Sequence, residues 1–365
     1  MTMYFTIRII ICRIIYLISC SLITPEHCVS IPVSPASHSG TKQERGIRPV
    51  KEYKILFWNL ENYFDTFDDP ATSDNEFTRE GERRWSWKRF TKKRNDIAKV
   101  ILSAGNELTE GEPGYPVLIA LSEVENRFVL DQLVKCSPLA MLEYSVIHRN
   151  SPDERGIDVA LLYRRRYFSL IENKYYTVKA EGQARNTRLI LYAKGVLQEL
   201  DTLHIFVNHW PSKFGGEKIS RPYRECAAKT LLMICDSIFM KNKNANIVLT
   251  GDFNDTPDSD IFSTFEKFIN LAKPFALKGE GTIRYKGVWE MIDMFFISRN
   301  LSDQQEPVAC GEDAMEIVKI PFLMEKDPVY LGVRPRRCYT GPRYNGGVSD
   351  HLPVILKIGK MFDYR

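Results

Sequence analysis

Seven polar residues that could form a metal or acid–base site follow apolar runs of the chain. Asn59 follows ILFW, Glu123 follows LIALS and His209 follows IFVN. The motifs GDFNDTP and VSDHLPV supply the other four, which are Asp252, Asn254, Asp350 and His351. If the apolar runs are neighbouring strands, the loops after them can bring all seven side chains into one cleft.

The residue types in this set suit a hard metal ion combined with proton transfer. Glu123 and Asp350 offer the oxygen ligands that Mg²⁺, Mn²⁺ and Ca²⁺ prefer. His209 and His351 titrate near neutrality and can bind anionic oxygens or move protons. Taken singly, each motif has a simpler explanation, because an acidic residue after a strand is usually a helix cap and a lone histidine is usually structural. The ordered recurrence of all five motifs favours a catalytic site.

The elements that must position these residues alternate between strands and helices. Apolar, β-branched runs predict strands over residues 53–58, 117–122, 157–163, 187–196, 203–208, 247–250, 292–297 and 353–357. Helical segments are expected over 87–104, 127–135, 222–240 and 259–269. Several strands are apolar throughout, which indicates burial on both faces and therefore an α/β protein.

The chain divides into a leader, a linker and one large domain. Residues 1–28 carry a short basic start and an apolar run interrupted by Arg13, which is the pattern of an export signal. Cys20 could become lipidated, which would allow membrane attachment, whereas a misassigned start codon would leave a cytoplasmic protein. Residues 29–50 are rich in Ser, Pro and Gly and indicate a linker, and residues 51–360 are expected to form a single catalytic domain.

Composition narrows the function only slightly. The net charge of +4 is compatible with a polyanionic substrate without being diagnostic. Of eight cysteines, three lie in the leader, and the other five are scattered without the spacing of a zinc site or a disulfide framework. No stable protein partner is implied.

The ordered set WN, SEVEN, NHWPSK, GDFND and SDHLPV resembles the endonuclease/exonuclease/phosphatase (DNase I-like) superfamily over residues 53–358. The resemblance implies a four-layer α/β/β/α sandwich of two packed mixed sheets. It also implies a phosphoesterase that uses a divalent metal ion, Mg²⁺ first and Mn²⁺ or Ca²⁺ as alternatives, at one end of that sandwich.

The resemblance also assigns a role to each candidate residue. Glu123 becomes the principal metal ligand, with Asn59 and Asp350 beside it. The catalytic residues that it implies are His209 and His351 for the phosphoryl oxygens or for acid–base work, Asp252 for the attacking water, Asn254 for the phosphate, Asp158 as the partner of His209, and Asp293 as the partner of His351.

The expected substrate is DNA, RNA or both. Inositol-phosphate phosphatases of this superfamily usually have the elements GD-N-Y-R and P-A-W-C-D-R, and this chain has GDFNDT and EMIDMF in their place. The segments GDFNDTP and HWPSKFGGE, together with the leader, look more like secreted bacterial nucleases. Basic and aromatic residues gather at 83–89 and 334–344, where they could contact the phosphates and stack on the bases of a nucleic acid. The residues expected to bind substrate are Arg155, Arg185, Arg188 and Lys213.

Two alternatives remain open. A sphingomyelinase-like or other lipid or small-molecule phosphodiesterase would need an exposed apolar hairpin, and the sequence shows none that is convincing. A silent binding protein is disfavoured because competent residues fill every candidate position. The long segment 300–347 before the last motif is expected to determine substrate specificity.

Overall fold

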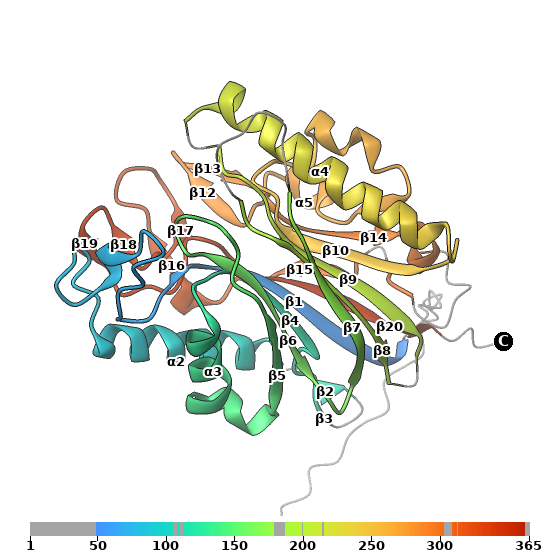
Figure 1. The fold of residues 1–365 in the computed structure, drawn as a ribbon, viewed down its shortest axis with the longest axis horizontal. Helices are drawn as coiled ribbons and strands as arrows, with labels where there is room; N and C mark the ends of the chain where they lie inside the picture. Colours follow the sequence, from blue (N-terminus) through green and yellow to red (C-terminus); the bar gives the residue numbers. More distant parts are fainter. Residues whose placement is uncertain are drawn as a thin grey trace, which may run out of the picture. The chain divides into compact units, whose positions relative to one another are not determined.

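Two six-stranded mixed sheets lie face to face in the computed structural model of the chain (Figure 1). The first sheet has the order β15 (Met315–Ile317), β20 (Val354–Met361), β1 (Pro49–Tyr63), β4 (Leu118–Val124), β6 (Asp158–Arg164), β5 (Tyr144–His148). The second has the order β11 (Phe268–Asn270), β14 (Asp293–Ser298), β10 (Asn246–Asp252), β9 (Thr202–His209), β8 (Ile190–Leu197), β7 (Phe168–Tyr176). Only β1–β4 and β9–β10 pair in parallel among these neighbours.

The structure describes residues 49–105, 108–109, 112–178, 187–198, 200–213, 215–302, 309–311 and 313–361. These residues fall within a compact unit that spans Ile47–Arg365. The predicted leader, nearly all of the linker, and Arg185 lie outside the described residues. No helix in the described part is long and apolar enough to cross a membrane.

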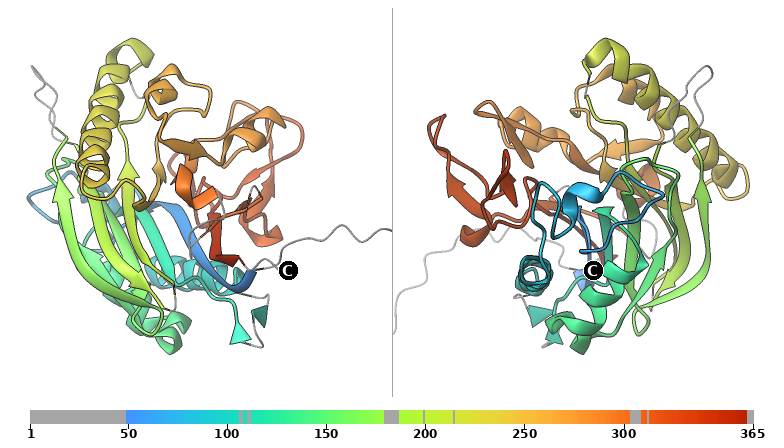
Figure 2. Two further views of the ribbon diagram at one scale, coloured as in Figure 1. Left: turned by 90° about the vertical axis from the view of Figure 1, so that its right-hand side faces the viewer. Right: turned by 60° about the vertical axis from the view of Figure 1, so that its left-hand side comes forward.

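Helices cover the outer face of each sheet, which makes four layers (Figures 1 and 2). α2 (Trp87–Ser103) and α3 (Arg127–Cys136) lie against the first sheet, and α4 (Glu217–Phe239) and α5 (Lys273–Leu277) lie against the second. The ILFW run of β1 is apolar throughout because both of its faces are buried. Ile55 and Phe57 point into the core shared with the second sheet, whereas Leu56 and Trp58 pack with α2 and α3. The expected α/β/β/α sandwich is confirmed.

All eight predicted strands are present, but one predicted helix is wrong. Residues 259–269 form a 3-10 turn, Asp260–Thr264, and then enter β11. The spacing of Phe262, Phe265 and Phe268 imitates a helical period, yet these rings belong to an aromatic cluster beneath the sheet. α4 also begins at Glu217, before the predicted start, and contains Pro222.

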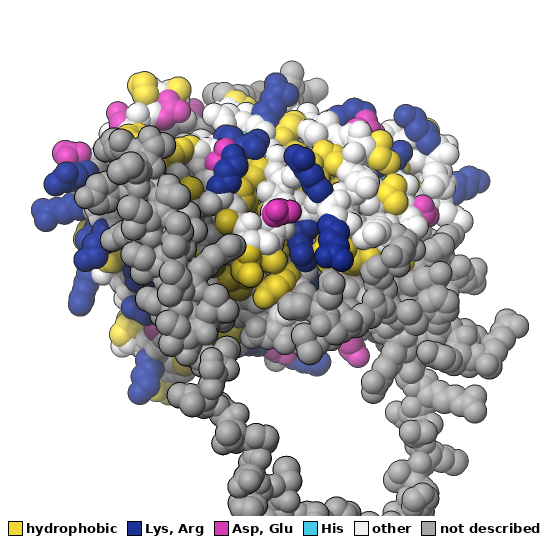
Figure 3. Space-filling model, turned by 90° about the horizontal axis from the view of Figure 1, so that it is seen from below, with side chains coloured by type: hydrophobic (Ala, Val, Ile, Leu, Met, Phe, Trp, Pro, Cys, Tyr) yellow, Lys and Arg dark blue, Asp and Glu magenta, His cyan; other side chains and the backbone are white. Residues whose placement is uncertain are grey.

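The segment before the last motif contains short hairpins at one end of the sandwich. After β15, β16 (Met324–Lys326) pairs with β17 (Val333–Pro335), and β18 (Tyr339–Thr340) pairs with β19 (Arg343–Tyr344). A further hairpin joins β12 (Ile283–Tyr285) to β13 (Val288–Glu290). Figure 2 shows the hairpins of residues 324–344, in red, beside the blue loop that follows β1. On the face shown in Figure 3, basic side chains are dispersed rather than gathered into one patch.

The aromatic cluster generates a stability prediction. The Phe296 ring is buried and lies 5.1–5.2 Å from the ring centroids of Phe253, Phe262 and Phe265. Phe296→Ala should lower the free energy of unfolding by about 3–5 kcal/mol, because the cavity it leaves cannot close fully. Met240→Ala, at an exposed position, should change it by less than about 0.5 kcal/mol. Urea unfolding measures both, and equal losses would contradict the packing described.

Candidate active site

Strand register brings functional residues together at one end of the second sheet. Asp252, the last residue of β10, pairs with His209, the last residue of β9. On its other side, Asp252 pairs with Asp293, the first residue of β14. In the first sheet, Asn59 of β1 pairs with Ser122, the residue before Glu123. The carboxyl ends of the parallel pairs therefore lie at the same end of the sandwich, where open α/β sheets place ligands.

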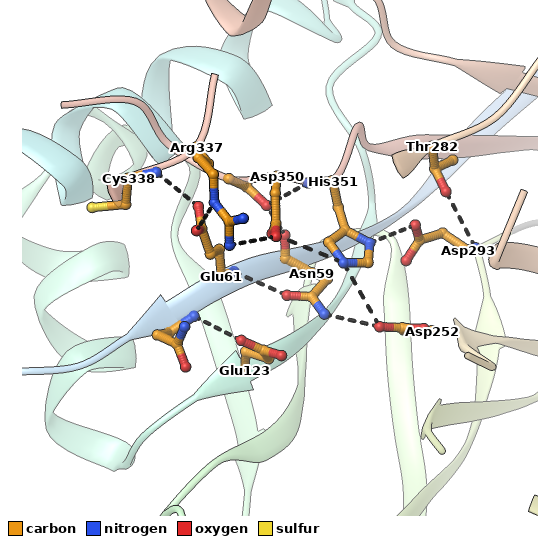
Figure 4. Close-up of polar contacts among 12 residues, drawn as sticks. Asn59, Glu61, Glu123, Asp252, Thr282, Asp293, Arg337, Cys338, Asp350 and His351 are labelled. Carbon is orange, nitrogen blue, oxygen red and sulfur yellow. Dashed lines mark hydrogen bonds and ion pairs between the residues drawn. The ribbon is translucent and has the colours of Figure 1, made fainter. Parts of the chain in front are cut away.

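The two sheets are joined at this end through Asp252 (Figure 4). Asn59 Nδ2 donates a 3.0 Å hydrogen bond to Asp252 Oδ2. His209 Nε2 lies 3.7 Å from the same oxygen, and His351 Nε2 lies 3.9 Å from it. His209 Nε2 also lies 3.9 Å from Glu123 Oε1. Residues scattered over the sequence thus meet in one cluster, as the motif order predicted.

Unusual backbone geometry aims the Glu123 side chain. Glu123 has a φ of +56° and interrupts the register between β4 and β6. The register between β1 and β4 also shifts after Asn59, and Asn62 there has a φ of +58°. The Asn62 N–H donates to Glu123 Oε2 at 2.9 Å. Bulges and left-handed residues of this kind are frequent at functional sites because they redirect a side chain out of the ladder.

His351 is held by the acid that the sequence assigned to it. Its Nδ1 lies 2.7 Å from Asp293 Oδ2, which confirms this predicted pair. The Trp58 indole donates to the His351 carbonyl, and the His351 N–H donates to the Ser349 hydroxyl. Burial acts to lower the pKa of His351, but the Asp293 carboxylate, aided by Asp252 and Asp350, raises it well above the usual 6.5.

The other predicted pair, Asp158 with His209, is not formed. Asp158 Oδ2 lies 2.9 Å from His148 Nε2, and Asp158 Oδ1 accepts from the Ser151 N–H. The physical reason is strand placement, because Asp158 and His148 lie on neighbouring strands of the first sheet whereas His209 belongs to the second. Within the described residues, the buried His209 Nδ1 has no hydrogen-bond partner.

His209 consequently differs from His351 in charge. Burial lowers the pKa of His209 well below its usual 6.5, and the cations Arg188 and Arg155 lower it further. The surroundings therefore favour the neutral form of His209 and the protonated form of His351. The two imidazoles flank the same carboxylate of Asp252, whose own pKa is raised to about 7 by burial and by repulsion from Asp293.

Asn254 binds a backbone carbonyl, whereas Arg155 reaches the site and Lys213 lies outside it. Asn254 has a φ of +50°, and its Nδ2 donates to the Trp210 carbonyl at 2.9 Å, so part of its side chain is already engaged. Arg155 is half exposed and lies 3.8 Å from Glu123 Oε2, so it reaches the site as predicted. Lys213 is partly exposed and pairs with Asp255 at 3.3 Å, outside this cluster.

Arg188 does not have the free guanidinium expected of a substrate ligand. It is buried, and its Nη1 pairs with Asp153 at 3.2 Å while its Nη2 donates to the Trp210 carbonyl. Its function in this geometry is to position the loop after β9 and to keep positive charge near His209. With Arg155, it lines a cavity of about 630 Å³ beside the site.

Sequence reasoning missed an ion-pair network at the mouth of the site. Arg337 Nε lies 3.0 Å from Glu61 Oε1, and Arg337 Nη2 lies 3.0 Å from Asp350 Oδ2 (Figure 4). The signals present were the acidic residue two positions after Asn59 and the arginine-rich segment 334–337. Neither signal indicated that the two segments would meet.

The donor set fits a divalent cation at Glu123. Four carboxylates, those of Glu61, Glu123, Asp252 and Asp350, lie around the cleft and offer oxygen donors, and Arg155 and Arg337 lie beside them. Among the described residues, Glu123 Oε1 accepts no hydrogen bond, and its oxygen is a ligand that Mg²⁺, Mn²⁺ and Ca²⁺ prefer.

A second candidate donor set is less suitable. Donor atoms of Asp252, Asp293 and His351 lie within 4.8 Å of one another. In this set, one oxygen of Asp293 and the Nδ1 of His351 already bind each other, and Asp252 Oδ2 accepts from Asn59. Glu123, whose Oε1 has no such partner among the described residues, is the better candidate ligand.

Comparison with known proteins agrees with this geometry. The chain belongs to the Endonuclease/Exonuclease/phosphatase family, whose model matches residues 54–360. It is therefore a phosphoesterase of a family that depends on divalent metal ions. No curated protein sequence matches it significantly.

Solved structures show the same fold at low sequence identity. The human Nocturnin catalytic domain with bound sulfate has a TM-score of 0.52 and 15% identity, over 87% of this chain and 97% of that one. D. rerio TDP2 complexed with single-strand DNA product has a TM-score of 0.50 and 13% identity, over 85% of this chain and 99% of that one. The endonuclease/exonuclease/phosphatase from Bacteroides vulgatus has a TM-score of 0.50 and 15% identity, over 85% and 99%.

The opposed histidine pKa values give a test by pH. In metal-free protein, NMR should show His351 titrating above pH 6.5 and His209 below it. Asp293→Asn should bring the pKa of His351 down by at least about one unit, because its main charge partner is removed. His351 gains affinity for a proton on folding, so the stability from this pair is fully present below pH 6.5 and is lost as pH rises through the raised pKa.

Urea unfolding checks the same pair independently. Asp293→Asn should therefore be more destabilising at pH 6 than at a pH above the folded-state pKa of His351. A destabilisation that grows with rising pH, or a His351 resonance that titrates below that of His209, contradicts the assignment.

Proposed function

We propose that this chain is a metal-dependent nuclease that hydrolyses phosphodiester bonds of DNA, RNA or both. The observation that carries the proposal is the meeting of Glu123, His209, Asp252 and His351 from both sheets within 3.9 Å contacts. A phosphodiester repels nucleophiles, so its hydrolysis needs positive charge on the phosphoryl oxygens and a group that accepts the proton of water.

The chain's own residues divide these tasks. Asp252, fixed by Asn59, accepts a proton from water or orients it. His351, positively charged through Asp293, stabilises negative charge that develops on a phosphoryl oxygen, while neutral His209 can donate from one ring nitrogen. A divalent cation at Glu123 would supply Lewis-acid charge stabilisation. Arg155, beside Glu123, is placed to contact a flanking phosphate.

Exposed aromatic rings near Glu123 support a nucleic-acid substrate. Phe67 and Trp87 are exposed, and each lies within about 6.5 Å of the Phe128 ring, on the helix that begins four residues after Glu123. Such rings can stack on unpaired bases. The basic segments 83–89 and 334–344 also meet, since the Arg89 guanidinium lies 4.3 Å from the Tyr344 ring centroid. TDP2 of the same fold holds a single-strand DNA product.

The proposal is tested by turnover of the full-length protein on plasmid DNA, RNA, sphingomyelin and an aryl phosphodiester with Mg²⁺ or Mn²⁺. Glu123→Ala and His209→Ala should each lower kcat/KM by about 10²–10³-fold, the scale of removing one preorganised electrostatic group. His204→Ala is the matched control, because His204 lies at the other end of β9 and bonds to Tyr192. Activity that survives EDTA, or an equal loss in the control, contradicts the proposal.

A second candidate function, hydrolysis of a membrane phospholipid, is favoured by one observation. No convincing apolar hairpin is evident in the sequence, but the β16–β17 hairpin exposes Val329 at 75% and Leu331 at 96%. Tyr285 and Val288 of the neighbouring β12–β13 hairpin are exposed as well. Contiguous exposed apolar side chains with basic residues beside them, here Lys286 and Lys326, are typical of membrane contact.

Both hairpins are ordered and connected to the site. Arg284 contacts Asp327 and the Val333 carbonyl, which fastens the β12–β13 hairpin to the β16–β17 hairpin. Ile283, the first residue of β12, forms a bridge with His351. An apolar tip on this frame would hold the site at a fixed distance from a bilayer.

Co-sedimentation with phosphatidylcholine–sphingomyelin vesicles decides between the two functions. A lipid phosphodiesterase should bind and hydrolyse the vesicles, and Leu331→Asp should weaken binding about tenfold or more, because a charge cannot enter the acyl boundary without a large cost. Met233→Asp, at an exposed position of α4, is the control. Absence of binding and lipid turnover by the wild type, with nucleic-acid turnover present, rejects the lipid function.

A further inference from the structure

Arg337 joins two acidic residues that approach the site from different segments. It lies between β17 and β18, within the long excursion that precedes the last motif. Its Nε pairs with Glu61 Oε1 and its Nη2 with Asp350 Oδ2, both at 3.0 Å. Figure 4 shows the guanidinium between the two carboxylates, on the side of Asn59 away from Asp293.

The Glu61 carboxylate is fully engaged by this segment. Glu61 is buried, and its Oε2 accepts the Cys338 N–H at 2.8 Å while its Oε1 binds Arg337. The Lys93 ammonium donates to its backbone carbonyl. Both carboxylate oxygens therefore already have partners, which leaves Glu61 poorly available as a metal ligand even though it lies beside Asn59.

The guanidinium is also well suited to stay in place. A planar fork that bridges two carboxylates forms charge-assisted hydrogen bonds and, unlike lysine, remains charged at any pH a protein experiences. Removing it would leave the buried Glu61 charge without its main partner, which is strongly unfavourable. At the same time the Arg337 side chain is 44% exposed, so part of it is open to solvent.

We propose that Arg337 is the permanent second cation of the site, so that the protein binds a single divalent ion, at Glu123. Arg337 then acts as a positioning residue that orients Asp350 and ties the 311–347 excursion to the reacting end of the sandwich. A second metal ion between Glu61 and Asp350 is excluded because the guanidinium fills that position and would repel it. This inference rests on the metal dependence contained in the proposed function but not on the identity of the substrate.

Metal-binding stoichiometry tests the inference without any substrate. Calorimetric titration of the full-length protein with Mn²⁺ should show one ion per chain. Glu61→Gln should leave the Mn²⁺ dissociation constant within about threefold, because Glu61 is not a ligand, whereas Glu123→Gln should weaken it by about 10-fold or more. Two ions bound by the wild type, or a loss in Glu61→Gln as large as in Glu123→Gln, would overturn the inference.

Arg337→Met provides the complementary result. Freed of the guanidinium, Glu61 and Asp350 should take up a second Mn²⁺, and the stoichiometry should rise from one to two. Arg336→Met, the neighbouring exposed arginine, should stay at one. A folded Arg337→Met protein that still binds one ion contradicts the role of Arg337. If this variant does not fold, the wild-type stoichiometry and the Glu61→Gln comparison decide the question.

The outcome is separable from that of the proposed function. One bound Mn²⁺ with no turnover of any nucleic acid would reject the nuclease and leave the role of Arg337 intact. Nuclease activity with two bound ions would support the nuclease and reject the role of Arg337.

Discussion

The hydrogen bond from Asn59 to Asp252 is the constraint on which the site depends. It joins Asn59, where the regular pairing of β1 with β4 stops, to the last residue of β10 in the other sheet, at 3.0 Å. Within each sheet, ladder register fixes the remaining residues relative to these two, because Glu123 follows the partner of Asn59 and His209 is the partner of Asp252. This contact between the sheets therefore fixes Glu123 relative to His209, and Asp293, which pairs with Asp252 and binds His351, adds the second imidazole. The close-packed core between the sheets maintains that spacing.

The environment then shifts the pKa values of the two histidines in opposite directions. Each lies just under 4 Å from the same Asp252 oxygen, yet only His351 has a carboxylate on its other nitrogen. His209 has two arginines nearby and no partner for Nδ1 among the described residues. Pairs of titratable groups whose pKa values are driven apart in this way are the usual mark of distinct acid and base roles. Here the separation is built from buried side chains, so it does not depend on a flexible loop.

Much of this arrangement follows from local sequence. An apolar run that ends in Asn59, Glu123, His209 or Asp252 places the polar residue at a strand end whatever the rest of the chain does, and the fold then gathers such ends. The pairing of His351 with Asp293 was predictable from the resemblance. What the sequence did not reveal depends on tertiary contact. Whether Asp158 meets His148 or His209 is decided by which sheet each strand joins.

The other differences have the same origin. Arg188 was expected to face substrate, but its guanidinium is buried against Asp153 and the Trp210 carbonyl. The cross-link of Glu61 by Arg337 joins residues 276 positions apart, which no local pattern indicates. The phenylalanines of 259–269 have helical spacing but pack beneath a sheet, and the exposure of Leu331 is set by how Arg284 fastens two hairpins.

Anomalous scattering from crystals grown with Mn²⁺ tests the central claim most directly, because it locates the cation without reference to substrate. The account predicts a single strong peak at about 2.0–2.2 Å from Glu123 Oε1, on the side that faces His209 and Asp252. A peak between Asp252, Asp293 and His351, or between Glu61 and Asp350, with none at Glu123, would contradict it.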